Sequence, residues 1–567
     1  MAVVGNTIGL PALSRVFLSN LLIIFIALLL AVGIGWLLVD YGRILLLHRK
    51  MPPGPLPLPI IGNTHLLPEN KPWIYFEKLS KSLNSPVITF WIGRNPTVWI
   101  NDAWSASELL DKKAAIYASR PRMVVFAELT NMGQSSDSHA KIPGSNLVTM
   151  YYGDRWRVHR KLTHLGVGLQ KVRNYRPFQN DESRIIAYEL LKTPNKYAAH
   201  FERYATSVVS IIGFGRRVAS IEDPIITEVI AVMQKAADLN VPGKTFPMLF
   251  ETFPLLARLP PDWFPLLFQG LGKRQRGQQF FYALTEEAHQ KDPHRDCYAN
   301  HLFNEAPKYG LRQDEISSLS GNLFGAGSDT SSSTLITFVL ACCAFPEALS
   351  TAWEELDRVV GHHRSPSWDD EPELVYTKAF MKEVFRWRSV AIIGGQPHAP
   401  VTDDSWNGFV IPKGTWTQGN VWAIHHNDRD FPEPDTFKPE RFLKDSSDSR
   451  PFPNERGYMT FGWGRRACSG QGLAEQGTFI TVARLLWAFS IQKGLDDQGR
   501  EIPVDIFNYT NGLNMRPQPF PCRFTPRSDA IRRAVEQEGI QALEALSIYN
   551  GESERIGQFF QKNNQGD

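Results

Sequence analysis

Residues 461–470 read Phe-Gly-Trp-Gly-Arg-Arg-Ala-Cys-Ser-Gly, a glycine-rich loop directly before a long apolar segment. Glycines allow tight turns and a close approach of the backbone to a flat ligand. Residues 470–489 are apolar almost all round, which predicts a buried helix that begins just after Cys468. Cys468 then lies at a helix N-terminus, where the helix dipole and free N–H groups favour a thiolate over a thiol.

Cys468 has two interpretations. An isolated cysteine is most often a packed, unreactive side chain. A thiolate can instead be an electron-donating axial ligand of haem iron. The loop favours the second interpretation, because it fixes the pattern F-x-x-G-x-R-x-C-x-G, in which Arg466 offers charge-assisted hydrogen bonds to a carboxylate.

This loop resembles the haem-binding signature of the cytochrome P-450 family. Four further motifs of the family occur in the family's order between about residues 52 and 525. The resemblance implies a mainly α fold with small β-sheets. It also implies a haem b cofactor that contacts Phe461 and Arg466 and whose iron is bound by Cys468.

Residues 312–345 can form one long helix, with Gly-Ala-Gly-Ser-Asp-Thr at 325–330 near its centre. Glycines inside a helix cost up to about 1 kcal/mol each relative to alanine, so the helix is weakened there. An ordinary Ser/Thr-rich helix, whose hydroxyls bond the preceding turn, is the alternative. The segment resembles the family's oxygen-activation motif A-G-x-D-T, which assigns proton delivery to Asp329 and Thr330.

Glu383 and Arg386 lie three residues apart, close enough to pair on one helix face. A surface pair of this kind contributes under about 1 kcal/mol, and the bare spacing carries little information. Residues 439–442, Pro-Glu-Arg-Phe, resemble the family segment whose arginine joins such a pair. We therefore predict a structural, non-catalytic triad of Glu383, Arg386 and Arg441.

Trp156 and Arg160 are four residues apart, so a helix presents both on one side. An indole N–H and a guanidinium fork are suitable donors to a carboxylate, although a packed tryptophan beside a solvent-facing arginine is the commoner case. The pair resembles the family's W-x-x-x-R clamp on a haem propionate. His398, in Pro-His-Ala at 397–399, resembles the residue that binds the other propionate, with Arg466 as the fourth donor.

Three mostly apolar segments, near 323–327, 390–395 and 511–513, match the family's substrate-contacting segments by position. They predict a pocket for a small or medium hydrophobic substrate, an aromatic one in particular. Core packing explains these residues about as well. The predicted lining residues are Phe324, Ala326, Val390, Ile392, Ile393 and Leu513.

Residues 16–39 carry no charge and are long enough to cross a bilayer core of about 30 Å. A cleavable signal peptide is the alternative, although its apolar region is usually only about 7–15 residues. Basic residues are more frequent after the span than before it, which places the body of the protein in the cytosol. We predict a single transmembrane helix at 16–39, a short luminal N-terminus at 1–15 and a location in the endoplasmic reticulum membrane.

The rest of the chain predicts one domain. Residues 51–63 are too rich in proline for a helix or a central strand and predict a stiff hinge. The chain has 567 residues, 43% of them hydrophobic, enough for a large core at 64–527. A net charge of +3 gives no reason to expect a nucleic-acid partner. The extension 528–567 is expected to be solvated, with a polar amphipathic helix at 530–546.

Taken with the resemblance, these features predict a membrane-anchored haem-thiolate monooxygenase that inserts one oxygen atom of O2 into a substrate C–H bond. No dinucleotide-binding or flavin unit is recognisable, so electrons are expected from an NADPH–cytochrome P-450 reductase, with cytochrome b5 as a further donor. A basic docking face for the reductase is predicted at Lys161, Lys382, Arg388, Arg429 and Arg465, although ordinary solvated charges explain these residues equally well.

Two other functions stay open, a P-450-type isomerase or dehydratase that needs no O2, and a non-catalytic haem sensor. Retention of Asp329 and Thr330 argues against the isomerase. Residues 386–441 and 511–520 resemble fungal secondary-metabolism members of the family. These hydroxylate small aromatic polyketides such as m-cresol and other methyl-phenols, which is the substrate class that the resemblance implies.

Overall fold

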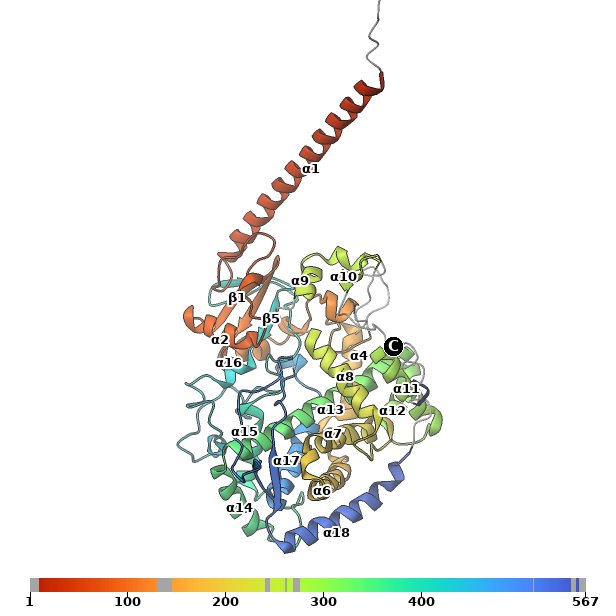
Figure 1. The fold of residues 1–567 in the computed structure, drawn as a ribbon, viewed down its shortest axis with the longest axis vertical. Helices are drawn as coiled ribbons and strands as arrows, with labels where there is room; N and C mark the ends of the chain where they lie inside the picture. Colours follow the sequence, from red (N-terminus) through yellow and green to blue (C-terminus); the bar gives the residue numbers. More distant parts are fainter. Residues whose placement is uncertain are drawn as a thin grey trace, which may run out of the picture.

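The fold is mainly helical, with three small β-sheets among the described residues, as the sequence predicts (Figure 1). The structure is a computed structural model that describes residues 10–129, 145–239, 245–260, 263–268, 276–512, 514–551 and 557–559.

Helix α13, Gln313–Ala344, crosses the middle of the molecule and confirms the long helix predicted at 312–345 to within one residue at each end (Figure 1). Helix α7, Tyr197–Phe214, packs along it. A Cβ added at Gly327 would lie 2.4 Å from a methyl carbon of Val209 on α7. The glycine therefore allows the two helices to approach closely at the centre of α13.

Helix α17, Gln471–Ala488, is the apolar helix predicted after the Cys468 loop, and it is buried along most of its length. It packs against α6, Arg176–Lys192. Helices α4, Asp154–Val167, and α15, Val375–Trp387, complete the surroundings of the loop. The loop is thus held between rigid elements.

The largest sheet joins distant parts of the sequence. Strands β1, Val87–Ile92, and β2, Asn95–Ile100, form an antiparallel hairpin. Strand β5, Trp416–Gly419, pairs parallel to β2. Two further antiparallel pairs are β3, Asp404–Trp406, with β4, Phe409–Ile411, and β6, Phe489–Lys493, with β7, Cys522–Pro526.

The remaining α-helices surround this frame. They are α2 Pro72–Ser82, α3 Ala103–Ala106, α5 Leu169–Arg173, α8 Pro224–Leu239, α9 Thr245–Thr252, α10 Pro265–Phe268, α11 Arg276–Lys291, α12 Tyr298–Tyr309, α14 Glu347–Val359 and α16 Val421–His425.

Helix α1, Leu10–His48, projects from the body of the protein (Figure 1). Its stretch Asn20–His48 is long and apolar enough to cross a membrane, and its most apolar window is not buried against the rest of the protein, which suggests a membrane anchor. Asp40 near its end accepts a 2.8 Å bond from Arg94 Nε, so the base of α1 is fixed to the β1–β2 turn. Residues 1–9 of the predicted luminal segment lie outside the described residues.

The described part of the C-terminal extension packs against the body of the protein, contrary to our expectation that the extension is solvated. Its helix α18, Asp529–Ala545, confirms the predicted helix but packs along α6 (Figure 1). Ile531 is 0% exposed. The periodicity predicted an amphipathic helix, but could not identify the surface that buries its apolar side.

Candidate active site

A cavity of about 360 Å³ lies between α4, α7, α13 and α17 and the loops around residues 394 and 466. Its walls are mainly apolar. The residues predicted from sequence that line it are Trp156, Arg160, Ala326, Thr330, Val390, His398, Phe461, Arg466 and Cys468. Most of the predicted site therefore comes together around one space.

Cys468 faces this cavity from the tightly folded loop. Its backbone N–H donates to Phe461 O at 2.8 Å, and Gly464 N–H donates to Asp111 Oδ1 at 2.7 Å. Gly464 has a φ of +53°, a conformation that favours glycine. Burial raises the pKa of the Cys468 thiol, whereas the backbone N–H groups of Gly470 and Gln471 lower it. The sulfur thus lies at the start of α17, as predicted.

Three guanidinium groups gather at one end of the cavity: Arg120, Arg160 and Arg466. Burial, followed by repulsion from the neighbouring arginines, lowers the pKa of Arg466 to about 8. Burial and the charge of Arg160 lower that of Arg120 to about 9. Within the described part of the chain, no Asp or Glu forms a recorded ion pair with any of the three. This end of the cavity therefore favours an anionic ligand.

Trp156 and His398 lie at the same end. Trp156 Nε1 is buried without a hydrogen-bond partner among the described residues, and the Arg466 guanidinium lies 4.4 Å from the centre of its ring. His398 Nδ1 lies 2.9 Å from Tyr117 O. Burial and then the charge of Arg120 lower the pKa of His398 to about 3. The orphaned indole N–H is a donor in need of an acceptor.

Arg120 is not among the site residues predicted from sequence. Its Nη1 donates to Gln396 O at 2.9 Å and to Pro397 O at 3.0 Å, and its Nε donates to Val148 O at 3.0 Å. These contacts connect segments far apart in the sequence. The local sequence Ser-Arg-Pro-Arg at 119–122 carries no recognisable signal for this position.

Thr330 and Asp329 have different surroundings. Thr330 lines the cavity, and its Oγ1 donates to Ala326 O at 2.6 Å, one helical turn earlier. Asp329 is 3% exposed and does not line the cavity. Its Oδ2 instead accepts a 2.6 Å hydrogen bond from Asn514 Nδ2. In this structure Thr330 lines the cavity and Asp329 does not.

Of the residues predicted to line the substrate pocket, some line the cavity and others lie in the core. Ala326 and Val390 line the cavity, but Phe324, Ile392 and Ile393 do not. Phe324 packs in the core, with its ring centre 5.4 Å from that of Phe214. Ile392 and Ile393 are buried in the same core cluster. The alternative of core packing therefore applies to these three, and Leu513 lies outside the described residues.

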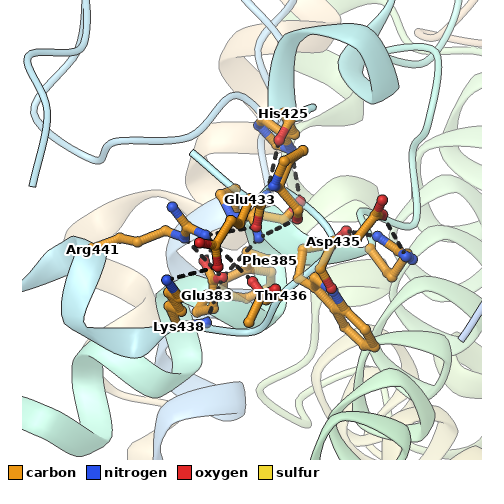
Figure 2. Close-up of polar contacts among 12 residues, drawn as sticks. Glu383, Phe385, His425, Glu433, Asp435, Thr436, Lys438 and Arg441 are labelled. Carbon is orange, nitrogen blue, oxygen red and sulfur yellow. Dashed lines mark hydrogen bonds and ion pairs between the residues drawn. The ribbon is translucent and has the colours of Figure 1, made fainter. Parts of the chain in front are cut away.

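Glu383, Arg386 and Arg441 form a buried charged cluster, and none of them lines the cavity. Figure 2 shows Glu383 and Arg441 among the polar contacts of this region. Arg386 binds both oxygens of Glu383 at 2.7 Å, and Arg441 Nε lies 3.5 Å from Glu383 Oε1. Arg386 Nη1 also donates to His425 O at 2.9 Å. His425 Nε2 in turn accepts from Met459 N at 2.9 Å, just before the Cys468 loop. The cluster is placed to support the loop, which fits a structural role.

Comparison with known proteins gives a consistent result. The Cytochrome P450 family matches residues 52–520. Cytochrome P450 monooxygenase virE of Hypocrea virens is 33% identical over 520 residues, which cover 89% of this chain and 91% of that protein. Cytochrome P450 monooxygenase fogE of Aspergillus ruber is 31% identical over 505 residues, covering 88% and 91%. For cytochrome P450 monooxygenase yanC of Aspergillus niger the identity is 32% over 523 residues, covering 89% and 94%.

Membership of this family implies a haem-thiolate cofactor and the general need for a reductase. The cavity, the loop that carries Cys468 and the sequence match over most of the chain all point to this family. The chain therefore belongs to the cytochrome P450 family and is a cytochrome P450 monooxygenase.

Proposed function

We propose that the cavity would hold haem b, with Cys468 binding the iron and Phe461 contacting the cofactor. A haem with a thiolate ligand supplies the O2-activating chemistry of this proposal. The observation that carries it is the buried cationic end of the cavity, where three guanidinium groups have no carboxylate partner among the described residues.

The two haem propionates fit this end in charge and in hydrogen bonding. Arg120, Arg160 and Arg466 supply positive charge, and Trp156 supplies an N–H that lacks an acceptor. His398 lies at the same end, in the loop whose Pro397 carbonyl accepts a hydrogen bond from Arg120. Propionate carboxylates between the three arginines would offset the repulsion among their positive charges. They would also give the Trp156 indole N–H an acceptor.

Thr330 and Asp329 deliver protons in this proposal. Thr330 is the member of this pair on the cavity side, because it lines the cavity and Asp329 does not. Burial raises the pKa of Asp329, which keeps a proton available on this carboxyl closer to neutral pH.

The substrate is a small hydrophobic molecule of the methyl-phenol type, made or used in fungal secondary metabolism. Apolar side chains of α7 and α13 supply the wall, among them Val208, Val209 and Leu323. Ala326 and Val390 add further apolar contacts. The fungal relatives support this setting, and the aromatic class rests on the resemblance noted for residues 386–441 and 511–520.

Electrons come from an NADPH–cytochrome P450 reductase, with cytochrome b5 as a further donor. Two residues of the predicted basic face do not suit docking. Arg388 is 2% exposed and bonds Asp435, and Arg429 pairs with Asp430 and Asp102. The proposed face is therefore reduced to Lys161, Lys382 and Arg465.

The protein works at the cytosolic face of the endoplasmic reticulum, anchored by α1. The α9–α10 region lies at the α1 end of the molecule (Figure 1). Leu255 and Trp263, in the segment between α9 and α10, have exposed side chains. Trp263 is 79% exposed. Apolar side chains at this end suit a body that rests against the bilayer.

The test is turnover of candidate phenols in microsomes that contain this chain and an NADPH–cytochrome P450 reductase. We expect a product that carries one atom of isotopically labelled O2, found by mass spectrometry, and its loss without NADPH or with Cys468→Ala. A product formed without O2 would contradict the oxygenase. Absence of both a type I spectral shift and a product across the methyl-phenols would rule out that substrate class.

A further inference from the structure

The C-terminal extension continues past α18 to the far end of α7. It forms a short helix at Leu546–Tyr549 and is then bonded to the residues that follow α7. Arg217 N donates to Tyr549 O at 2.9 Å. A Cβ added at Gly551 would lie 3.3 Å from Nζ of Lys291, the last residue of α11. The extension therefore reaches α11, although the family match ends at residue 520.

Phe559 belongs to the last described stretch of this extension, residues 557–559. It is 8% exposed, and its ring centre lies 5.7 Å from that of Phe280 on α11. Phe280 in turn lies 6.4 Å from Phe324 on α13. Distances of about 4.5–7 Å between ring centres are typical of favourable aromatic contacts. The extension thus adds one ring to an aromatic row that leads to the central helix.

Helix α11 lies against α13 at two glycines. A Cβ added at Gly321 would lie 2.5 Å from Cγ of Phe281, and one at Gly325 would lie 3.5 Å from Cζ of the same ring. The two glycines are four residues apart, so they share one face of α13. Leu323 and Ala326, in the same stretch, line the cavity. The part of α13 that receives α11 is therefore also part of the cavity wall.

Close packing makes this wall depend on its support from behind. Protein interiors are packed about as densely as organic crystals, so a change in one side chain is passed to the next. Without the ring of Phe559, Phe280 and then Phe324 can relax into the vacated space. Helix α13 is then held less firmly beside the cavity. A small ligand loses close contacts, which weaken across even a narrow gap, whereas a larger ligand gains room.

We propose that Phe559 is a positioning residue for the substrate cavity, which holds α11 against α13 through Phe280 and so keeps the cavity selective for small hydrophobic molecules. Phe559 does not itself line the cavity. The inference deepens the proposed function and rests on it, because it assumes that haem and a small ligand bind in this cavity. It gives the C-terminal extension a role in ligand selection besides the packing of α18.

The experiment compares two haem ligands of different size on the full-length holoenzyme. Phenylimidazole and its bulkier biphenyl analogue bind haem iron through nitrogen, whatever the natural substrate, and the spectral shift gives a dissociation constant for each. In Phe559→Ala we expect phenylimidazole to bind severalfold more weakly and the biphenyl analogue to bind as well as before or better. Hydrogen exchange in α11 should become faster in the same variant, because the change passes through this helix.

Three further variants define the comparison. Ile548→Ala changes a side chain of the same extension that is 68% exposed, and it should match wild type. Val98→Ala truncates a buried side chain of β2 in another core cluster, so it should lower stability without changing the ratio of the two dissociation constants. Phe559→Leu keeps an apolar side chain and should shift the ratio in the same direction by less. It tests the inference even where the alanine variant retains little haem.

The outcomes separate this inference from the proposed function. The same ratio in Phe559→Ala and Ile548→Ala would overturn the inference. An equal change in Val98→Ala would also overturn it, because lost stability alone would then explain the effect. A wild-type protein that binds neither imidazole would overturn the haem site and this inference together. If the imidazoles behave as expected but no methyl-phenol gives a type I shift, the inference stands and only the proposed substrate class fails.

Discussion

Trp156, whose Nε1 has no hydrogen-bond partner among the described residues, is a sensitive probe of the proposed haem site. Trp156→Phe keeps an aromatic ring beside Arg466 but removes the only donor of the side chain. Because a hydrogen bond to a charged group contributes about 1.5–3 kcal/mol, we expect haem to bind about ten- to a hundredfold more weakly. Haem transfer to apomyoglobin measures this change. Trp263→Phe is the control, and equal haem release from both variants would show that Trp156 does not hold the cofactor.

A small change in the buried cluster of Glu383, Arg386 and Arg441 should strongly lower the stability of the fold. Glu383→Gln leaves Arg386 and Arg441 without their carboxylate partner, and breaking a buried ion pair typically costs about 3–5 kcal/mol of stability. Glu305→Gln is the matched control. Glu305 and Lys308 are also three residues apart, but their ion pair is exposed, and such pairs contribute under about 1 kcal/mol. Urea unfolding of the two variants compares them. Equal stability would mean that the triad does not support the fold.

The residues that sequence predicted best are those whose neighbours are local. Cys468, Phe461 and Arg466 share one loop, so their pattern could be read directly. Phe324 and Ala326 are only two residues apart, but two helical residues differ by about 200° in direction, so one faces the core and the other the cavity. Arg120 and Asn514 depend on contacts with distant segments, which a single sequence does not reveal.

At the scale of elements, Glu251 couples α9 to the short helix Val124–Leu129. Its Oε1 accepts from Val125 N at 3.0 Å, with Arg122 and Glu128 nearby. Burial raises the pKa of Glu251 from its usual 4.5 to about 7, although the N–H groups of residues 124 and 125 lower it. The two elements therefore share a titratable contact.

This contact should weaken as pH rises. An acid with a higher pKa in the folded chain than in the unfolded chain stabilises the fold fully below its unfolded pKa, and this stability is lost up to the folded pKa. The loss therefore falls between about pH 4.5 and 7. Hydrogen exchange in α9, corrected for the intrinsic rate, should increase over this range and level off above it. Glu251→Gln should remove the trend, and an unchanged trend in that variant would disprove the assignment.

At the scale of the whole molecule, the C-terminal helix α18 extends the fold beyond the part that matches the family, which ends at residue 520. Glu538 Oε1 accepts from Ser365 N at 2.9 Å, so α18 is also bound by polar contacts to the loop after α14. Its apolar side faces α6, with Ile531 fully buried, while Ile540 is exposed. The helix is part of the folded domain.

Substitutions on the buried and the exposed side of α18 should differ in their effect on stability. Ile531→Ala is expected to cost about 2–5 kcal/mol, the usual range for truncating a buried isoleucine. Ile540→Ala lies on the same helix but should change stability by under about 0.5 kcal/mol. Thermal unfolding followed by circular dichroism distinguishes them. Equal unfolding temperatures would show that α18 does not pack on α6 in solution.

In the proposed function, the Cys468 thiolate binds haem iron in this cavity. The most direct measurement is the absorption spectrum of the purified, haem-supplemented protein after reduction and addition of carbon monoxide. We predict the long-wavelength Soret band of cysteinate coordination, and its absence in Cys468→Ala. A colourless protein, or a carbonyl adduct without that band, would contradict the account.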